Sequence, residues 1–305
     1  MSGILLLDKP PGISSNQALQ VVRRALQAAK GGHTGNLDVA ATGLLPLCFG
    51  EATKVCSLLL DSTKRYLAEV QLGRTTTTGD LEGEVISSTT ALPTERAVIE
   101  AALTHFRGAQ QQIPPMFSAL KHQGQPLYKL ARRGIEIERA PREVTISTLT
   151  LLDLIGDRLH LDITCSKGTY IRSLAIDLGA HLGCGATLAH LRRVQVGHFT
   201  VTQAHPLDIF TAATYSPATF DELLLPLDAA LTDYAMLELV AAAAHGFVQG
   251  QASEAATQLR GAVRVYHQQR FLGIGLVDDH GRLLPKRVMQ ADLRSAFECK
   301  VDDLP

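Results

Sequence analysis

The stretch GGHTGNLDVAATGLLPLCFGEATKV, residues 31–55, surrounds a single carboxylate, Asp38, with small residues and threonines. Glycine permits backbone conformations and close approaches that other residues resist, so the glycines around Asp38 predict a tight loop that leads into a strand. A lone aspartate in such a loop is typical of a turn or a helix cap, and it is also a candidate nucleophile or base. The loop by itself leaves both interpretations open.

Further motifs follow in order along residues 7–199. They are LDKPPGISSN, KRYLAEVQLG at 64–73, PPMFSALKHQGQPLYKLARRG at 114–134, CSKGTYIRSLAIDLG at 165–179 and LRRVQVGHF at 191–199. Together with 31–55, these blocks resemble the pseudouridine synthases of the bacterial tRNA type, whose catalytic motif is often written GHxGxLDxxATGxL. Every fixed position of that motif is filled here, while Asn36 and Val39-Ala40 depart from its usual wording and leave the acid in place.

The resemblance implies roles for individual residues. Asp38 would be the catalytic nucleophile, Tyr66 would stack on the target base and accept a proton, and Arg172 would pair with Asp38. A guanidinium there would keep the acid ionised, and its planar fork could hold the carboxylate through two bonds. Taken by themselves, Tyr66 is more typical of a core and Arg172 of a surface. The other substrate-binding residues that the resemblance implies are His33, which replaces the flipped base in the RNA stack, Tyr170 and Leu191, which contact the base, and Lys9, which with Pro10 supports the catalytic loop.

Apolar periodicity and turn residues predict both strands and helices. Strands are expected at 4–7, 44–49, 65–72 and 188–193, with a hairpin of 144–154 and 158–165 around Gly156-Asp157. Helices are expected at 51–60 and 93–106, from 171 onward, and from a cap at Ser14 or Ser15 to about residue 29. Two acidic amphipathic helices are expected over 206–231, before a small β unit at 264–268, 271–277 and 283–289.

The resemblance implies an α+β fold of two domains. The catalytic domain, 1–232, would contain a mixed, mostly antiparallel sheet, and 233–305 would form a small β-rich domain related to the RNA-binding PUA domain. An RNA-gripping insertion is expected at about 107–142, which includes an irregular basic segment at 110–134.

Charge is distributed unevenly along the chain. The net charge of −1 argues at first against a nucleic-acid partner. However, 194–259 contains seven acids and no Lys or Arg, while 117–142 contains six basic residues and two acids. Such segregation is suited to steering RNA, although a charge run is also typical of a solvated face. Within the insertion, the expected RNA contacts are Lys129, Arg132 and Arg133.

Composition limits the other classes. The chain has 305 residues, of which 46% are hydrophobic, so it can bury a large core. Its apolar runs are too short for a membrane span and no signal peptide is evident, so a cytoplasmic location is expected. The five cysteines form no CxxC pair or Cys/His cluster, and neither a Walker A string nor a complete GxGxxG occurs. We therefore expect no metal and no cofactor, and we expect a monomer without a protein partner.

The activity that the resemblance implies is isomerisation of uridine to pseudouridine in tRNA, at position 55 of the TΨC loop. One nucleophilic carboxylate can suffice, whether Asp38 attacks the sugar or the uracil or assists by proton abstraction. A non-catalytic RNA-binding or RNA-folding module on the same scaffold is the alternative. A glycoside hydrolase would need two carboxylates, and Asp38 has no evident partner acid in the matched blocks.

Overall fold

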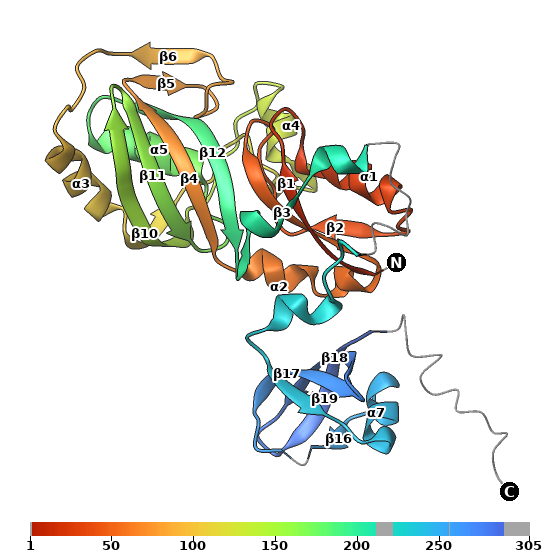
Figure 1. The fold of residues 1–305 in the computed structure, drawn as a ribbon. Helices are drawn as coiled ribbons and strands as arrows, with labels where there is room; N and C mark the ends of the chain where they lie inside the picture. The colour runs from red at the N-terminus through yellow and green to blue at the C-terminus, as the bar shows by residue number, and fades with distance from the viewer. Residues whose placement is uncertain (1, 212–221, 256, 290–305) are drawn as a thin grey trace, which may run out of the picture.

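Residues 2–211, 222–255 and 257–289 are described by the structure, a computed structural model. Its larger sheet has the strand order β14-β1-β3-β12-β4-β11-β10-β7, with β13 beside β12 and β2 beside β3. Two of the described pairings are parallel, β1 with β14 and β3 with β12, and the other pairings in this sheet are antiparallel. The expected α+β fold with a mixed, mostly antiparallel sheet is confirmed (Figure 1). The strands are β1 (Gly3–Lys9), β2 (Gly31–His33), β3 (Thr42–Phe49), β4 (Lys64–Leu72), β7 (Gly108–Gln112), β10 (Arg142–Ile155), β11 (Arg158–Cys165), β12 (Ala186–Val196), β13 (Phe199–Thr200) and β14 (His205–Pro206).

One face of the sheet is covered by three helices, α1 (Ser15–Ala25), α3 (Arg96–His105) and α5 (Ile171–His181). Alternate residues of β4 are buried on this face, Tyr66 and Val70 among them, because side chains of a strand point to opposite sides in turn. They share a hydrophobic cluster with Leu19 of α1, Leu103 of α3 and Leu174 of α5. Tyr66 therefore lies on the face of the sheet that the helices cover.

The helix expected after Ser14 is confirmed, and its start is set by a capping box. Ser14 Oγ accepts from the backbone N–H of Gln17, and the Gln17 side chain accepts from the backbone N–H of Ser14. The helix ends at Ala25, before the expected residue 29, because Gln27 has a positive φ of 51°. The expected helix 51–60 is divided into a 3₁₀ turn (Gly50–Lys54) and the short α2 (Cys56–Asp61).

The hairpin expected around Gly156-Asp157 is confirmed as β10 and β11, and Gly156 has the positive φ, 60°, that its turn needs. The strand expected at 188–193 is also found, but β12 is longer because it lies between β3 and β4 and pairs with both.

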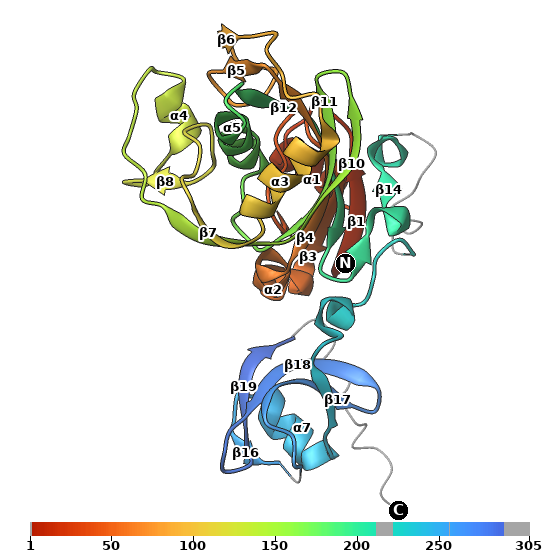
Figure 2. The same ribbon diagram turned by 90° about the vertical axis from the view of Figure 1, so that its left-hand side faces the viewer.

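The basic segment 110–134 is less irregular than expected. It begins in β7 of the main sheet and contains a hairpin of β8 (Lys121–His122) and β9 (Gln125–Pro126), followed by α4 (Leu127–Ala131). Figure 2 shows β8 and α4 projecting from the body beside α5. A second hairpin, β5 (Arg74–Thr76) with β6 (Val85–Ser88), extends beyond the end of β12.

The expectation of two acidic amphipathic helices over 206–231 is wrong for the described part, and 212–221 lies outside the described residues. The described part forms short 3₁₀ turns at Leu207–Phe210 and Leu227–Leu231. Backbone groups next to these turns bind β1 instead. Leu7 pairs with His205, and Ile4 exchanges hydrogen bonds with Leu225.

The second sheet has the order β15-β17-β18-β19-β16, where β15 is Ala235–Glu238, β16 Ser253–Glu254, β17 Gly261–His267, β18 Arg270–Val277 and β19 Arg282–Val288. The three expected strands are confirmed as β17, β18 and β19. The sheet curls around α7 (Ala241–Val248), consistent with a PUA-like domain (Figure 2). Lys54 Nζ donates to Val288 O at 2.6 Å, and Met289 packs in the cluster that contains Leu6, so this unit is anchored on the larger one. Across the described ranges, no helix is long and apolar enough to cross a membrane.

Candidate active site

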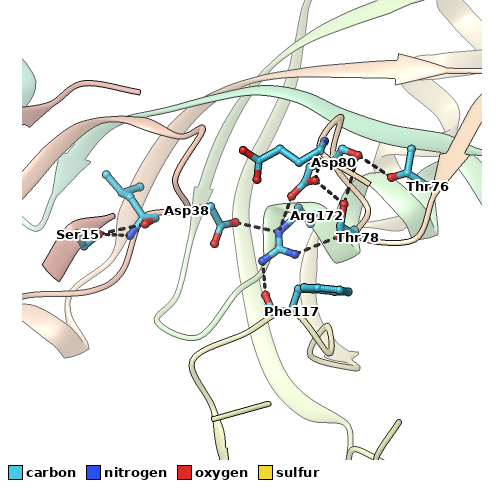
Figure 3. Close-up of polar contacts among 9 residues, drawn as sticks. Ser15, Asp38, Thr76, Thr78, Asp80, Phe117 and Arg172 are labelled. Carbon is cyan, nitrogen blue, oxygen red and sulfur yellow. Dashed lines mark hydrogen bonds and ion pairs between the residues drawn. The ribbon is translucent and has the colours of Figure 1, made fainter. Parts of the chain in front are cut away.

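A buried guanidinium joins three segments at the edge of the helix-covered face. Arg172, near the start of α5, donates from Nε to Asp38 Oδ2 at 2.9 Å, from Nη1 to Thr78 O at 3.0 Å and from Nη2 to Phe117 O at 2.7 Å (Figure 3). The Arg172 side chain is 4% exposed, whereas that of Asp38 is 47% exposed. The expected pair is therefore formed. The buried guanidinium holds the Asp38 carboxylate in place, and the carboxylate remains accessible to solvent.

A second carboxylate lies on the same guanidinium. Asp80 Oδ2 is 3.7 Å from Arg172 Nε, and the Asp80 side chain is 17% exposed. It also accepts hydrogen bonds from Thr78 Oγ1 and the Glu82 backbone N–H, which fix it within its own turn. No partner acid for Asp38 was evident in the matched sequence blocks. Asp80 lies close enough to be a partner acid. However, its side chain is engaged with Arg172 and with its own turn, so it does not face an open position for a second reacting group.

The residue before Asp38 is fixed by a buried hydroxyl. Ser15 Oγ accepts from the Leu37 backbone N–H at 2.8 Å and donates to Leu37 O at 3.1 Å. Because Ser15 is the first residue of α1, these bonds tie the loop to a rigid helix (Figure 3).

The residue after Asp38 is fixed by Lys9. Its ammonium donates to Pro10 O at 2.8 Å, to Ile13 O at 2.7 Å and to Val39 O at 3.3 Å. The Lys9 side chain is fully buried, so the expectation that it binds substrate is corrected, since RNA cannot reach it. Its contacts fit the supporting role instead.

Arg193 holds the rest of the loop. Its Nε donates to Leu44 O at 2.7 Å, its Nη2 to Gly35 O at 3.2 Å and its Nη1 to Asn36 O at 3.4 Å. The backbone of Arg193 runs parallel to Gly43, which has a φ of 101° and leaves no room for a Cβ, 2.2 Å from Arg193 O. The guanidinium is 1% exposed, and no carboxylate of the described residues forms an ion pair with it.

This uncompensated cation influences the neighbouring titratable groups. Burial raises the pKa of Tyr66, the cross-strand partner of Arg193, and the charge of Arg193 opposes that rise. Burial lowers the pKa of His33, and Arg193 lowers it further. Burial also lowers the pKa of Lys9 to about 8, with Asp38 opposing and Arg193 adding to the effect. A neutral His33 and a protonated Tyr66 are therefore the states at pH 7.

Tyr170 is the residue before α5, and its main chain is fixed by Gln112 of β7. Gln112 Oε1 accepts from Tyr170 N at 2.7 Å, and Gln112 Nε2 donates to Tyr170 O at 3.1 Å. Burial raises the pKa of Tyr170, while Ser118, Arg142 and Arg172 oppose the rise. The half-buried ring thus lies among the groups that surround Arg172.

The remaining expected residues are divided between the core and the surface. Leu191 is half-buried on β12, opposite Ala68 of β4, and packs on the main hydrophobic cluster. The three residues expected to contact RNA from the insertion are exposed on and after α4, and none of them forms a side-chain bond with the described residues around Arg172. These residues are Lys129, Arg132 and Arg133.

Sequence reasoning missed four residues that position the site: Ser15, Asp80, Gln112 and Arg193. Three of them bind backbone groups of the site. Because all residues have backbone groups, no side-chain pattern in the sequence shows which residue is bound. For Arg193, its place in the block LRRVQVGHF was the available signal. The described ranges contain no group of three or more His, Cys, Asp or Glu side chains that could hold a metal ion.

Three family descriptions match consecutive parts of the chain. "TruB family pseudouridylate synthase (N terminal domain)" matches residues 23–171, "tRNA pseudouridylate synthase B C-terminal domain" matches 172–232, and "Pseudouridine synthase II TruB, C-terminal" matches 235–289.

The chain is also similar to known proteins over most of its length. It is 51% identical over 296 residues to the tRNA pseudouridine synthase B of Pseudomonas fluorescens strain Pf0-1, covering 96% of this chain and 97% of the relative. It is 49% identical over 296 residues to the protein of the same name from Stutzerimonas stutzeri, with the same coverage. A crystal structure of a Cbf5-Nop10-Gar1 complex matches with a TM-score of 0.70 at 23% identity, covering 94% of this chain and 84% of that chain, and so supports the fold. The expected family is confirmed: the chain belongs to the TruB family of pseudouridylate synthases.

Proposed function

We propose that this protein isomerises uridine to pseudouridine in tRNA, at position 55 of the TΨC loop, with Asp38 as the nucleophile. The observation that carries the proposal is the pairing of a half-exposed Asp38 with a buried Arg172. A carboxylate that only capped a helix or a turn would not need a buried guanidinium fixed by two further carbonyls. The names of the relatives support the same reaction.

The chemistry balances without a redox change. The N1–C1′ bond breaks, the uracil turns, the C5–C1′ bond forms, and one proton passes from C5 to N1. An ionised Asp38 serves attack on either the sugar carbon or the uracil ring, because both need the same nucleophilic carboxylate. Tyr66 accepts the proton of C5 as a phenolate in this proposal, so the phenolic proton that it carries at pH 7 has to pass to the uracil N1 first, a loss that the charge of Arg193 favours.

The target base has to leave its stack before Asp38 can reach it. Tyr66 and Tyr170 supply rings against which the extruded base can stack, and Leu191 of β12 contacts the base as well. His33 takes the vacated place in the RNA, and its lowered pKa favours the neutral ring, which stacks without an added charge to desolvate. Lys129, Arg132 and Arg133 contact phosphates, because their exposed charges have no described acid partners.

The proposal also assigns a function to each of the two domains. Residues 1–232 form the catalytic domain, with the RNA-gripping insertion at about 107–142, and 233–305 form an RNA-binding domain, of which 290–305 lies outside the described residues. The separate strand order of the second sheet supports this division. We expect a monomer, which light scattering of the purified protein would test.

The decisive experiment is Asp38→Asn with unmodified tRNA, followed by mass-spectrometric mapping of pseudouridine. Asn keeps the size and removes the charge, so turnover should disappear while tRNA affinity and folding persist. Near wild-type turnover would show that Asp38 is a turn residue, because Asn suits such positions equally well. A wild-type protein that binds tRNA and forms no pseudouridine would instead identify a binding module.

A further inference from the structure

A hollow of about 150 Å³ lies inside the insertion, between the β8–β9 hairpin and the start of β10. Its apolar lining includes Leu127 and Ile137. Its charged lining consists of Lys121, Arg139 and Arg142, with Glu138 opposing them. The hollow therefore has an excess of positive charge next to apolar side chains. Apolar surroundings strengthen the attraction of these charges for an anion.

Arg139 is only partly satisfied. Its Nη1 donates to Ile137 O at 3.0 Å and lies 3.5 Å from Glu136 Oε1, whose side chain is 82% exposed. Its Nε is buried and has no hydrogen-bond partner within the described part of the chain. A buried donor without an acceptor is costly, so the position calls for an acceptor that the folded chain does not supply.

The other two cations are also uncommitted. Lys121 and Arg142 are exposed, and neither forms a side-chain hydrogen bond or an ion pair with the residues that the structure describes. On the surface of α4, by comparison, the Arg132 guanidinium lies 5.7 Å from the centre of the Tyr128 ring.

The hollow is connected to the active site through β7 and β10. Arg142 is the cross-strand partner of Gln112, and Gln112 holds the main chain of Tyr170 by two hydrogen bonds. The charge of Arg142 also opposes the rise that burial causes in the pKa of Tyr170. An anion in the hollow would therefore lie beside the residue that contacts the extruded base.

We propose that this hollow binds one phosphate group of the RNA backbone close to the flipped uridine, with Arg139 and Arg142 as its ligands and Lys121 at its rim. The inference rests on the proposed function. It adds a defined phosphate site to the phosphate contacts that the exposed basic residues on and after α4 make. Two guanidinium groups suit a phosphate because their planar N–H pairs match its oxygens.

The test neutralises one phosphate at a time. T stem-loop RNAs with a single methylphosphonate linkage are bound to the wild type, to Arg139→Gln and to Arg142→Gln, and the dissociation constants are compared. One linkage should weaken wild-type binding about tenfold, the change expected from a lost charge-assisted hydrogen bond. In Arg139→Gln and Arg142→Gln the unmodified RNA should already bind about tenfold more weakly, and neutralising that linkage should add little.

Arg133→Gln is the matched control, because it removes a basic residue of the same insertion outside the hollow. It should still show the full loss at that linkage. The inference is overturned if the losses from the linkage and from Arg139→Gln and Arg142→Gln simply add at every position. Pseudouridine formation by the wild type is measured separately, so its absence would refute the proposed function while leaving the phosphate coupling to be judged by the binding data. Circular dichroism shows that each variant is folded.

Discussion

Arg172 meets Asp38 through Nε alone, 2.9 Å from Oδ2, while its two terminal nitrogens bind Thr78 O and Phe117 O. The resemblance led us to expect a fork that could hold both carboxylate oxygens. Instead the fork is shared among the Asp38 loop, the β5–β6 hairpin and the segment that contains Phe117. Arg172 thus fixes Asp38 relative to two other segments, and it leaves the other carboxylate oxygen unoccupied by the guanidinium.

This sharing predicts the behaviour of Arg172→Lys. An ammonium keeps the charge but cannot reach three acceptors that lie in different directions, so Asp38 loses its fixed position. Single-turnover rate at saturating tRNA should fall about 100-fold, the effect of a misplacement near 1 Å, while affinity changes little. Quenched single-turnover assays measure the rate of pseudouridine formation. An unchanged rate would mean that charge alone is required.

Arg193 gives a second prediction, because it combines a structural clamp with a buried charge. Arg193→Gln and Arg193→Lys should each lower the free energy of unfolding by about 1–3 kcal/mol, since buried carbonyls of the Asp38 loop lose donors. The two variants should differ in electrostatics. The pKa of His33 should rise in Arg193→Gln, because Arg193 lowers it, and should rise less in Arg193→Lys, which keeps the charge.

NMR titration of the His33 ring measures this difference, and urea unfolding measures the stability. A pKa of His33 that is the same in Arg193→Gln as in the wild type would show that the charge of Arg193 does not act on His33. The comparison with Arg193→Lys separates that effect from a general loosening of the loop, which both variants share.

Much of the site could be predicted from sequence because its chemistry is local. Asp38 and His33 lie within one short motif, and Arg172 and Tyr170 lie at one helix start, so the resemblance could assign an expected role to each from a contiguous stretch. What joins the motifs was not evident. Ser15 and Arg193 bind backbone groups of the loop, and a backbone group leaves no trace in the sequence, whereas the support that Lys9 gives was expected from the resemblance.

The fold shows the same limit. The β10–β11 hairpin was predictable because its pairing is between neighbours around a glycine turn. The acidic periodicity of 206–231 predicted helices, but the described backbone there forms only short 3₁₀ turns, and Leu225 exchanges hydrogen bonds with Ile4 of β1, which is distant in the sequence. Tertiary pairing of that kind overrides a local helical preference.

Lys9 predicts a specific pH dependence of stability. Its pKa is lowered to about 8 in the folded protein from 10.5, so between these values the unfolded chain binds more protons. The Lys9 contribution to the free energy of unfolding should therefore rise with pH through this window, by about 1–2 kcal/mol between pH 8 and 9.5. Urea unfolding of the wild type and of Lys9→Met at both pH values isolates it, because Lys64 and all other groups are common to both. A gain in Lys9→Met equal to that of the wild type would contradict the assignment.

Gly43→Ala should be among the most destabilising small substitutions in the molecule. A Cβ at this position would lie 2.2 Å from Arg193 O and 2.8 Å from Arg193 N, and these atoms belong to the β3–β12 pairing that carries the loop. The φ of 101° adds a strain of about 1–3 kcal/mol for a residue with a side chain. Relief requires β3 and β12 to separate, which would displace Leu44 from Arg193 Nε and release the Asp38 loop.

Gly156→Ala is the control for that prediction. Gly156 also has a positive φ, 60°, but a Cβ there meets no atom within 4 Å. It should therefore lower the free energy of unfolding by only about 1–2 kcal/mol, the cost of the left-handed conformation, and leave turnover intact. Urea unfolding should place Gly43→Ala at least 2 kcal/mol below Gly156→Ala, with a loss of turnover in the folded fraction. Equal losses in the two variants would show that only the backbone angle matters and that the contact with Arg193 does not hold the loop.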